Sequence, residues 1–189
     1  TLGYQRKNLL KNTAVTKTQE GVTFTVNNDG SVTVNGTATS STWFTLSNSN
    51  KIFAGRYKLT SGIVGYGDNL MVVIAPKTVI GSVILNSTQG AKELSSMDGL
   101  FYAIRIKNGF TADNITIYPM LRYANITDDT YEPYKPSVQE QIDALISRIS
   151  VLESSQTDIV TSQNMSDEII TMNVEDEKYE RTENLEQTD

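Results

Sequence analysis

The stretch Tyr66-Gly-Asp-Asn69 places an aromatic ring, a carboxylate and an amide within four residues. Such a combination can hold the vicinal hydroxyls of a sugar, and its oxygen atoms are also of the kind that Ca²⁺ prefers. The alternative is an ordinary turn in which Asp68 and Asn69 bond their own backbone. We favour the turn, and we expect no metal site.

Two predicted strands place further aromatic and charged side chains on one exposed surface. Side chains alternate between the two faces of a strand, so Trp43 points away from the core in 42–46, and Phe101 and Arg105 share one face of 100–107. An exposed aromatic patch marks a protein interface as well as a ligand site. The alternative is therefore that Trp43 packs under a loop or against another subunit. The candidate ligand-binding residues are Trp43, Tyr66, Asp68, Asn69, Phe101 and Arg105.

The composition argues against catalysis. The chain has no Cys and no His, which removes thiol nucleophiles, imidazole bases and most transition-metal sites. Asp128 and Asp129 are adjacent, and neighbouring carboxylates in a turn point apart, whereas glycosidase carboxylates face each other across the substrate. We therefore predict a protein that is not an enzyme and that uses no cofactor.

Residues 13–134 have the pattern of a β-sandwich. Short apolar–polar alternations are separated by Gly, Asn, Ser and Asp, and no helical period lies among them. Asn27-Asn-Asp-Gly30 is the strongest hairpin signal, and 71–75 is apolar on both faces, which is typical of a central strand. We predict a mainly β, antiparallel, jelly-roll-type sandwich, preceded by a lead-in over 1–12 that docks Leu9 and Leu10. The predicted strands are 22–26, 31–35, 42–46, 55–60, 70–75, 79–85, 100–107 and 114–122.

A helix follows the sandwich. Pro133 and Pro136 interrupt the strand pattern, and Ser137 with Glu140 forms a capping box at the start of a helix. Apolar residues then step by four and three, the spacing of a heptad seam. We predict an oligomerising coiled-coil helix over 135–164 and an acidic tail, with a second helix as one option, over 165–189. The seam comprises Val138, Ile142, Leu145, Ile149, Leu152 and Ile159.

The seam has two interpretations. A lone helix can fold back on its own sandwich and remain monomeric, or it can associate with copies of itself. We favour self-association, because the two prolines direct the helix away from the strands. Ile142 and Ile149 at a with Leu145 and Leu152 at d favour a dimer on intrinsic grounds.

Charge is distributed unevenly along the chain. Residues 1–135 carry a net charge of +4 and residues 136–189 carry −10, which together give −6. No Lys/Arg stripe with interleaved aromatics is present, so we expect no nucleic-acid partner. No run of about 18 apolar residues occurs, so we expect no membrane insertion. The chain starts at Thr1 rather than Met, which is consistent with a piece of a longer protein.

Several stretches resemble a known module. Residues 7–14, 21–37 and 54–59, and Ile117-Tyr-Pro-Met-Leu-Arg122 followed by 127–134, resemble a carbohydrate-binding-like β-sandwich of tail and baseplate (receptor-binding) proteins. These proteins belong to phages and prophages of Gram-positive bacteria. The resemblance implies a jelly roll on a virion tail, followed by a short trimerising helix. It carries no settled set of sugar-contacting residues.

These observations lead to one main expectation and one alternative. The main expectation is a non-enzymatic, extracellular virion module that recognises bacterial cell-surface polysaccharide as a homotrimer rather than a dimer. The alternative is a purely structural virion decoration or adaptor, whose acidic helical tail docks onto a neighbouring virion protein.

Overall fold

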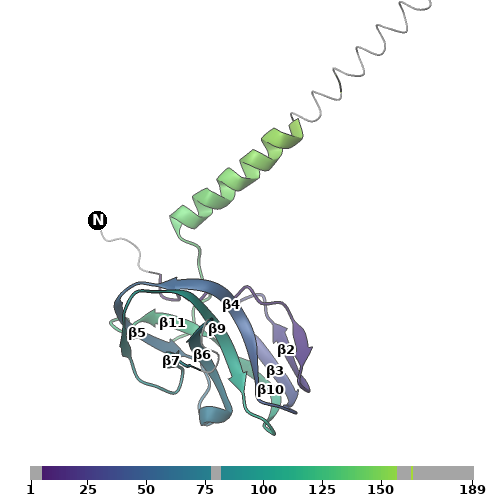
Figure 1. Ribbon diagram of the computed structural model, residues 1–189, viewed down its shortest axis with the longest axis vertical. Coiled ribbons are helices and arrows are strands. Elements are labelled where there is room, and N and C mark those ends of the chain that lie inside the picture. The colour runs from purple at the N-terminus through teal and green to yellow at the C-terminus, as the bar shows by residue number, and fades with distance from the viewer. Residues whose placement is uncertain (1–5, 78–81, 157–162, 164–189) are drawn as a thin grey trace, which may run out of the picture. The chain divides into compact units, whose positions relative to one another are not determined.

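The chain folds mainly into antiparallel β-sheets followed by one helix, as predicted. A computed structural model describes residues 6–77, 82–156 and 163 (Figure 1). The chain divides into two compact units, Thr1–Lys135 and Pro136–Asp189. The strands belong to the first unit and the helix to the second.

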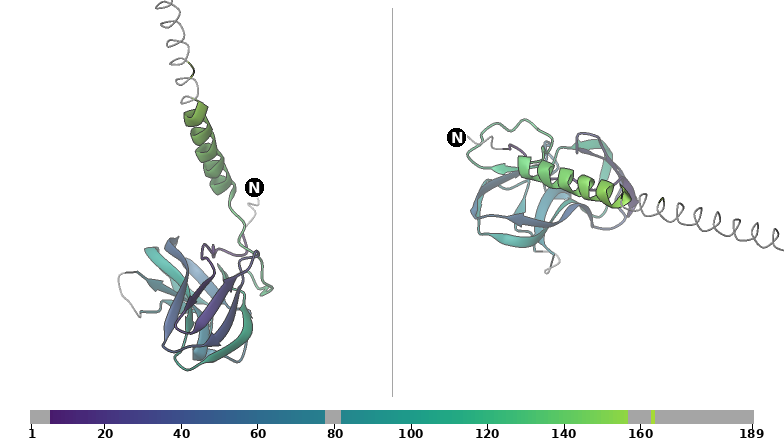
Figure 2. Two further views of the ribbon diagram at one scale, coloured as in Figure 1. Left: turned by 90° about the vertical axis from the view of Figure 1, so that its right-hand side faces the viewer. Right: turned by 90° about the horizontal axis from the view of Figure 1, so that it is seen from above.

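The strands form three antiparallel sheets. Their orders are β1-β2-β3-β10, β11-β5-β8 and β4-β9-β6-β7. Figures 1 and 2 show these sheets curving around a shared interior, which gives a sandwich-like fold. The elements are β1 (Lys17–Gln19), β2 (Val22–Val26), β3 (Val32–Thr37), β4 (Thr42–Ile52), β5 (Gly55–Thr60), the 3₁₀ helix η1 (Gly67–Asn69), β6 (Leu70–Pro76), β7 (Leu85–Asn86), β8 (Lys92–Leu94), β9 (Met97–Ile106), β10 (Thr111–Ile117) and β11 (Met120–Tyr123).

The predicted hairpin at Asn27–Gly30 is confirmed. The Asn27 N–H donates to the Ser31 carbonyl at 2.9 Å, and the Gly30 N–H donates to the Asn27 carbonyl at 2.9 Å. Gly30 has φ of +83°, a conformation that glycine adopts without steric cost. The turn therefore fixes the register of β2 against β3.

One hydrophobic core lies between the sheets. Phe24 of β2 stacks on Phe44 of β4 with ring centroids 4.5 Å apart, so two sheets meet face to face. Strand β6 lies between β9 and β7, and its residues from Leu70 to Ala75 are all buried. The prediction that the apolar run 71–75 forms a central strand is confirmed.

Two strand predictions need correction. The stretch 114–122 is two strands, β10 and β11, which belong to different sheets and are separated by Tyr118 and the buried Pro119. Proline donates no ladder hydrogen bond, so the strand ends there. In 79–85, the described residues 82–84 are not strand, and β7 begins at Leu85.

The lead-in is anchored to the end of the sandwich. Leu10 is buried and Leu9 packs against the core, as predicted. The Asn8 side chain is buried and donates to the carbonyls of Pro119 (3.2 Å) and Glu132 (2.9 Å). It also accepts the Leu10 N–H at 2.9 Å, so a single amide joins segments far apart in the sequence.

The second unit begins with the predicted capping box. The Ser137 N–H donates to the Glu140 carboxylate at 2.8 Å, and the Glu140 N–H donates to Ser137 Oγ at 3.1 Å. The helix extends over 138–156. Ile159 of the predicted seam and the predicted acidic tail over 165–189 lie outside the described residues.

Candidate functional site

Trp43, Phe101 and Arg105 lie on the outward face of one sheet. Trp43 of β4 is the register partner of Arg105 on β9, and the rings of Trp43 and Phe101 are 5.5 Å apart and tilted. The opposite face of these strands is core, where Phe44 is register partner of Ile104. The sequence pattern therefore assigned these three side chains to the correct face.

This outward face is itself partly packed. Met71, Val73 and Ala103 form a second, smaller buried cluster, against which Trp43 and Phe101 pack. Both aromatic side chains are consequently half-buried. Trp43 thus has a packing role against side chains of its own sheet, whereas the alternative interpretation placed it under a loop or against another subunit, and the residue stays partly exposed.

The Tyr66–Asn69 stretch is a helical turn whose side chains separate. The Asn69 N–H donates to the Tyr66 carbonyl at 3.0 Å. Tyr66 packs edge-to-face on Phe110 at 5.9 Å, against the main core. Arg105 Nη2 reaches the Asp68 carbonyl at 3.4 Å. The structure therefore brings Asp68 toward Arg105 but directs the Tyr66 ring to the core.

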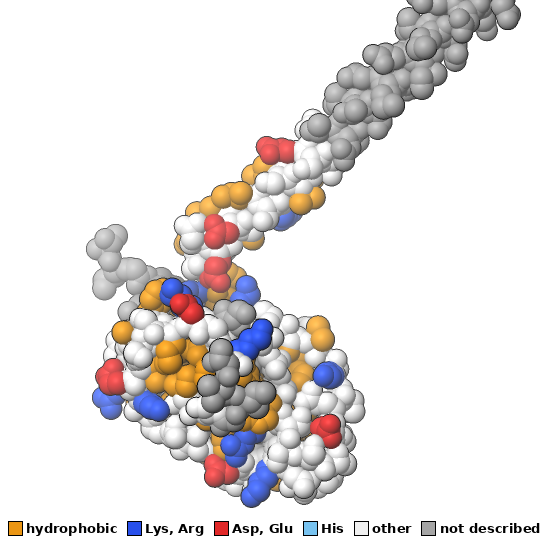
Figure 3. Space-filling view, viewed as in Figure 1, with side chains coloured by type: hydrophobic (Ala, Val, Ile, Leu, Met, Phe, Trp, Pro, Cys, Tyr) orange, Lys and Arg blue, Asp and Glu red, His pale blue; other side chains and the backbone are white. Residues whose placement is uncertain are grey.

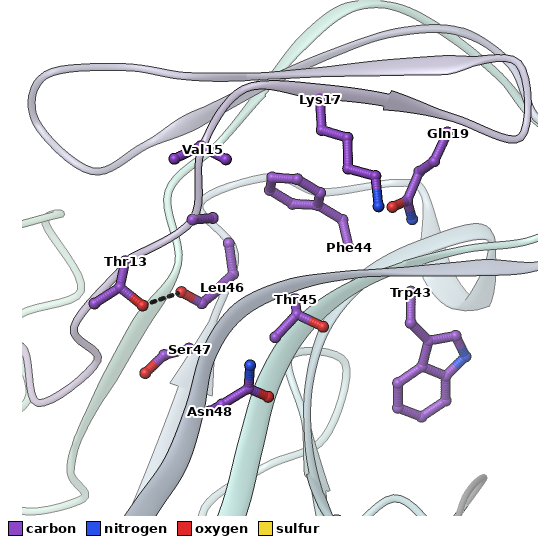
Figure 4. Close-up of a pocket in the computed structure, with 11 residues that line it drawn as sticks. Thr13, Val15, Lys17, Gln19, Trp43, Phe44, Thr45, Leu46, Ser47 and Asn48 are labelled. Atoms are coloured by element: carbon purple, nitrogen blue, oxygen red, sulfur yellow. Dashed lines mark hydrogen bonds between the residues drawn. The ribbon is translucent and has the colours of Figure 1, made fainter.

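A groove of about 300 Å³ lies between residues 13–19 and strand β4 (Figure 4). Strand β4 is an edge of its sheet, because β9 is its only ladder partner among the described strands. Its other edge faces the chain segment that leads into β1. The residues that line the groove are Thr13, Ala14, Val15, Lys17, Gln19, Trp43, Phe44, Thr45, Leu46, Ser47 and Asn48.

Hydrogen bonds join the two walls of the groove at both ends. At one end the Leu46 carbonyl accepts the Thr13 N–H at 2.8 Å and the Thr13 Oγ1 hydroxyl at 3.2 Å, and Figure 4 draws the second of these bonds. At the other end Gln19 Nε2 donates to Thr42 Oγ1 at 2.8 Å. The walls are held at a fixed separation, so the groove is a preformed feature of the fold.

The lining of the groove suits a polyhydroxylated ligand. Thr45 provides a hydroxyl and Asn48 provides an amide, so donors and acceptors are both available, whereas the Ser47 hydroxyl already donates to Asn50 Oδ1 at 2.9 Å. Lys17 is the one charged residue among the lining side chains and extends from β1 toward β4 (Figure 4). Trp43 also lines the groove, although its indole ring points to the side of β4 opposite Lys17 and Gln19 (Figure 4).

Sequence reasoning found one residue of this groove, Trp43, and missed the rest. The lining depends on β1, a three-residue strand of Lys17, Thr18 and Gln19 with no apolar residue to reveal it. Two of the polar lining residues of β4, Ser47 and Asn48, follow Leu46, where the prediction ended the strand. No local pattern indicated that these segments lie opposite each other.

The described residues offer no metal cluster. Within the described ranges, no group of three or more Asp and Glu side chains could hold a metal ion. Asp128 instead pairs with Lys7 at 2.6 Å, and Asp129 pairs with Arg122 and Lys58. These two carboxylates therefore hold cationic side chains of the protein.

Among the residues that the structure describes, no helix is long and apolar enough to cross a bilayer.

No protein-family model, curated protein or solved structure matches this chain significantly. The candidate site therefore depends on the geometry of the described residues.

Proposed function

We propose that this chain is a non-enzymatic, glycan-binding module of a phage tail or baseplate, which recognises bacterial cell-surface polysaccharide as a trimer. The observation that carries the proposal is the groove between β1 and β4. Its lining brings Trp43, at the edge of the groove, together with hydroxyl, amide and ammonium groups. Such a mixture suits a sugar, which offers apolar ring faces and many hydroxyls.

Self-association would raise an otherwise weak affinity. A shallow polar groove of this volume contacts only a few sugar units, so binding to a single site would be weak. Three copies joined at one stalk would bind a repetitive polysaccharide with a much higher avidity, because the second and third contacts become intramolecular. The trimer is therefore part of the binding mechanism in this proposal.

The helix supports the oligomeric part of the proposal. In the single chain the five seam residues within 138–156 expose between 43% and 74% of their surface, and Figure 3 shows hydrophobic side chains recurring along that helix. Ile146, at position e, is also exposed and widens the stripe beyond a and d. A wider stripe suits a bundle of more than two helices.

The remaining parts of the proposal come from the sequence. The resemblance to tail and baseplate modules supports a jelly-roll arrangement of the strands, a coiled-coil helix and a location on the virion. In this arrangement the module is extracellular and its partners are identical subunits, neighbouring virion proteins and the host polysaccharide.

Binding of purified cell-wall polysaccharide from a panel of Gram-positive bacteria tests the proposal. We expect Trp43→Ala to weaken binding by about tenfold or more, which corresponds to about 1.4 kcal/mol. Phe53→Ala is the matched control, because Phe53 is 62% exposed and does not line the groove. A trimeric protein that binds no polysaccharide of the panel would contradict the proposal.

A structural adaptor is the second candidate, and the charge of the tail favours it. Residues 136–189 carry a net charge of −10, which suits docking onto a basic surface of a neighbouring protein. Deleting residues 153–189 separates the two functions. Loss of virion assembly with retained polysaccharide binding would make the tail an attachment device, whereas assembly without any glycan binding would favour the adaptor.

A further inference from the structure

A second pocket lies where three distant segments of the first unit meet. Its volume is about 240 Å³, and it shares no lining residue with the groove. One wall comes from the end of β5, one from the connection between β10 and β11, and one from the exit segment, residues 124–135. The lining residues are Thr60, Gly62, Tyr118, Met120, Asp129 and Tyr131.

Two tyrosine rings form the apolar walls of this tyrosine pocket. The centroids of Tyr118 and Tyr131 are 5.2 Å apart and the rings are tilted by 56°, so they are not stacked face to face. Tyr131 Oη donates to the Asp29 carbonyl at 2.8 Å, which fixes its ring. Burial raises the pKa of Tyr131 to about 12, so this hydroxyl stays protonated as a donor.

Gly62 allows Tyr118 to occupy its position. Gly62 has φ of +67°, and a Cβ built on it would lie 2.8 Å from the Tyr118 Cβ. Any other residue would push the ring away. The Tyr118 N–H also donates to the Ser61 carbonyl at 2.8 Å, so backbone and side-chain contacts together define this wall.

The polar groups of the pocket retain hydrogen-bonding capacity. Asp129 Oδ1 accepts from Arg122 and, at 3.3 Å, from Lys58, whereas Oδ2 accepts only from Lys58 at 3.1 Å among the described residues. A carboxylate has about four lone-pair sites, so one acceptor site on Oδ2 remains. Over the same residues, the Tyr118 hydroxyl makes no hydrogen bond.

The local charge selects the class of ligand. Paired tyrosines beside a carboxylate can also bind an ammonium group. Here, however, Arg122 and Lys58 both pair with the single Asp129, so the surroundings carry no net negative charge. A cationic ligand would meet two positive charges, which leaves an uncharged polyhydroxylated ring as the better fit.

We propose that the tyrosine pocket is a second carbohydrate site, which holds a single uncharged pyranose unit. Tyr118 and Tyr131 would contact one face of the sugar ring, and Asp129 Oδ2 would accept a sugar hydroxyl. The inference takes its ligand class from the proposed function and adds a site remote in sequence from the groove. Its volume suits one sugar ring rather than a chain.

Titration of the full-length, isotope-labelled protein with methyl glycosides of glucose, galactose and N-acetylglucosamine tests the pocket by NMR. Trp43 is the one tryptophan in the sequence, so its indole N–H reports on the groove alone. The amides of Gly62 and Tyr118 report on the pocket. We expect at least one glycoside to shift the pocket amides saturably, and choline to leave them unchanged.

Two variants complete the test. Tyr118→Leu keeps apolar volume but removes the ring, and it should weaken the pocket response at least tenfold while the indole response is retained. Trp43→Ala should leave the pocket response unchanged. If only the indole signal shifts, the proposed sugar site in the pocket is wrong, but the proposed function is unaffected. The proposed sugar site would also be wrong if choline shifted the pocket amides saturably, or if the sugar response were undiminished in Tyr118→Leu. In the wild-type protein, pocket shifts that do not saturate would contradict the site without any variant.

Discussion

Arg122 is 2% exposed, although arginine is rarely buried in proteins. Its Nη2 donates to Asp129, whereas its buried Nε has no hydrogen-bond partner among the described residues. A buried guanidinium is costly unless its charge is compensated. Asp129 therefore pairs with two cations, because it neutralises Arg122 and also accepts hydrogen bonds from Lys58.

Asp129→Ala should destabilise the first unit by about 1–3 kcal/mol, because it leaves the Arg122 guanidinium buried without its carboxylate. Chemical denaturation followed by tryptophan fluorescence measures this loss. Asp128→Ala is the matched control, and its effect should be smaller because Asp128 pairs with Lys7 at a more exposed position. Equal effects of the two substitutions would contradict the role given to Arg122.

Acid should destabilise the protein in a defined window. Hydrogen bonds from Arg122 and then Lys58 hold the pKa of Asp129 below its ordinary value, and Lys7 does the same for Asp128. Because both pKa values are lower in the folded state, the stabilisation is present above about pH 4 and is lost as the pH falls further. Melting temperatures measured from pH 6 downward should decline below about pH 4.

The double variant Asp128→Ala/Asp129→Ala provides the control for this pH dependence. Its melting temperature should start lower and should fall less steeply over the same range, because two of the titrating groups are gone. A wild-type melting temperature that stays constant through the acid range would show that these ion pairs contribute no stability.

At the scale of elements, the sequence predicted what local chemistry determines. The Asn27–Gly30 turn and the Ser137/Glu140 capping box each depend on residues within four positions of one another, and both are present. The prediction of a single strand over 114–122 was wrong because the apolar pattern of β10 continues into β11. Pro119 interrupts the ladder between them, and their partners, β3 and β5, place them in different sheets.

The same distinction explains the candidate sites. Alternation along β4 and β9 placed Trp43, Phe101 and Arg105 on one face, because alternation is a local property. The groove and the tyrosine pocket each form between segments that meet only through tertiary packing. A pocket whose walls are Thr60, Tyr118 and Tyr131 leaves no trace in sequence spacing.

Ser137→Ala should weaken the start of the helix by about 1 kcal/mol, because it removes the hydroxyl that accepts the Glu140 N–H. Far-ultraviolet circular dichroism during thermal unfolding measures the helical content. Ser147→Ala is the matched control, since Ser147 lies exposed within the helix and alanine there favours helix formation. Identical responses from both variants would count against the cap.

At the scale of the whole molecule, the exposed seam determines whether the chain acts alone. A contiguous apolar stripe on a soluble helix is a recognised mark of an interface. The seam residues Ile142 and Ile149 are 43% and 52% exposed in the single chain. Association of identical helices would remove this surface from water.

Ile142→Glu/Ile149→Glu should convert the proposed trimer to a monomer, because it would place like charges at the centre of the seam. Light scattering coupled to size-exclusion chromatography measures the mass, which should fall from three subunits to one. Ser147→Glu/Ser154→Glu adds the same charge at position f, on the outer side of the helix, and should leave the mass unchanged. A wild-type protein with the mass of one subunit would refute self-association.

The anchoring of the lead-in has a mechanical consequence. Asn8 bonds the Glu132 carbonyl, Lys7 pairs with Asp128, and Arg6 donates to the Tyr134 hydroxyl at 2.8 Å. A pulling force applied between residue 6 and residue 134 would therefore stress these cross-links before it stressed any sheet. The sandwich would keep its shape under tension until these three contacts broke.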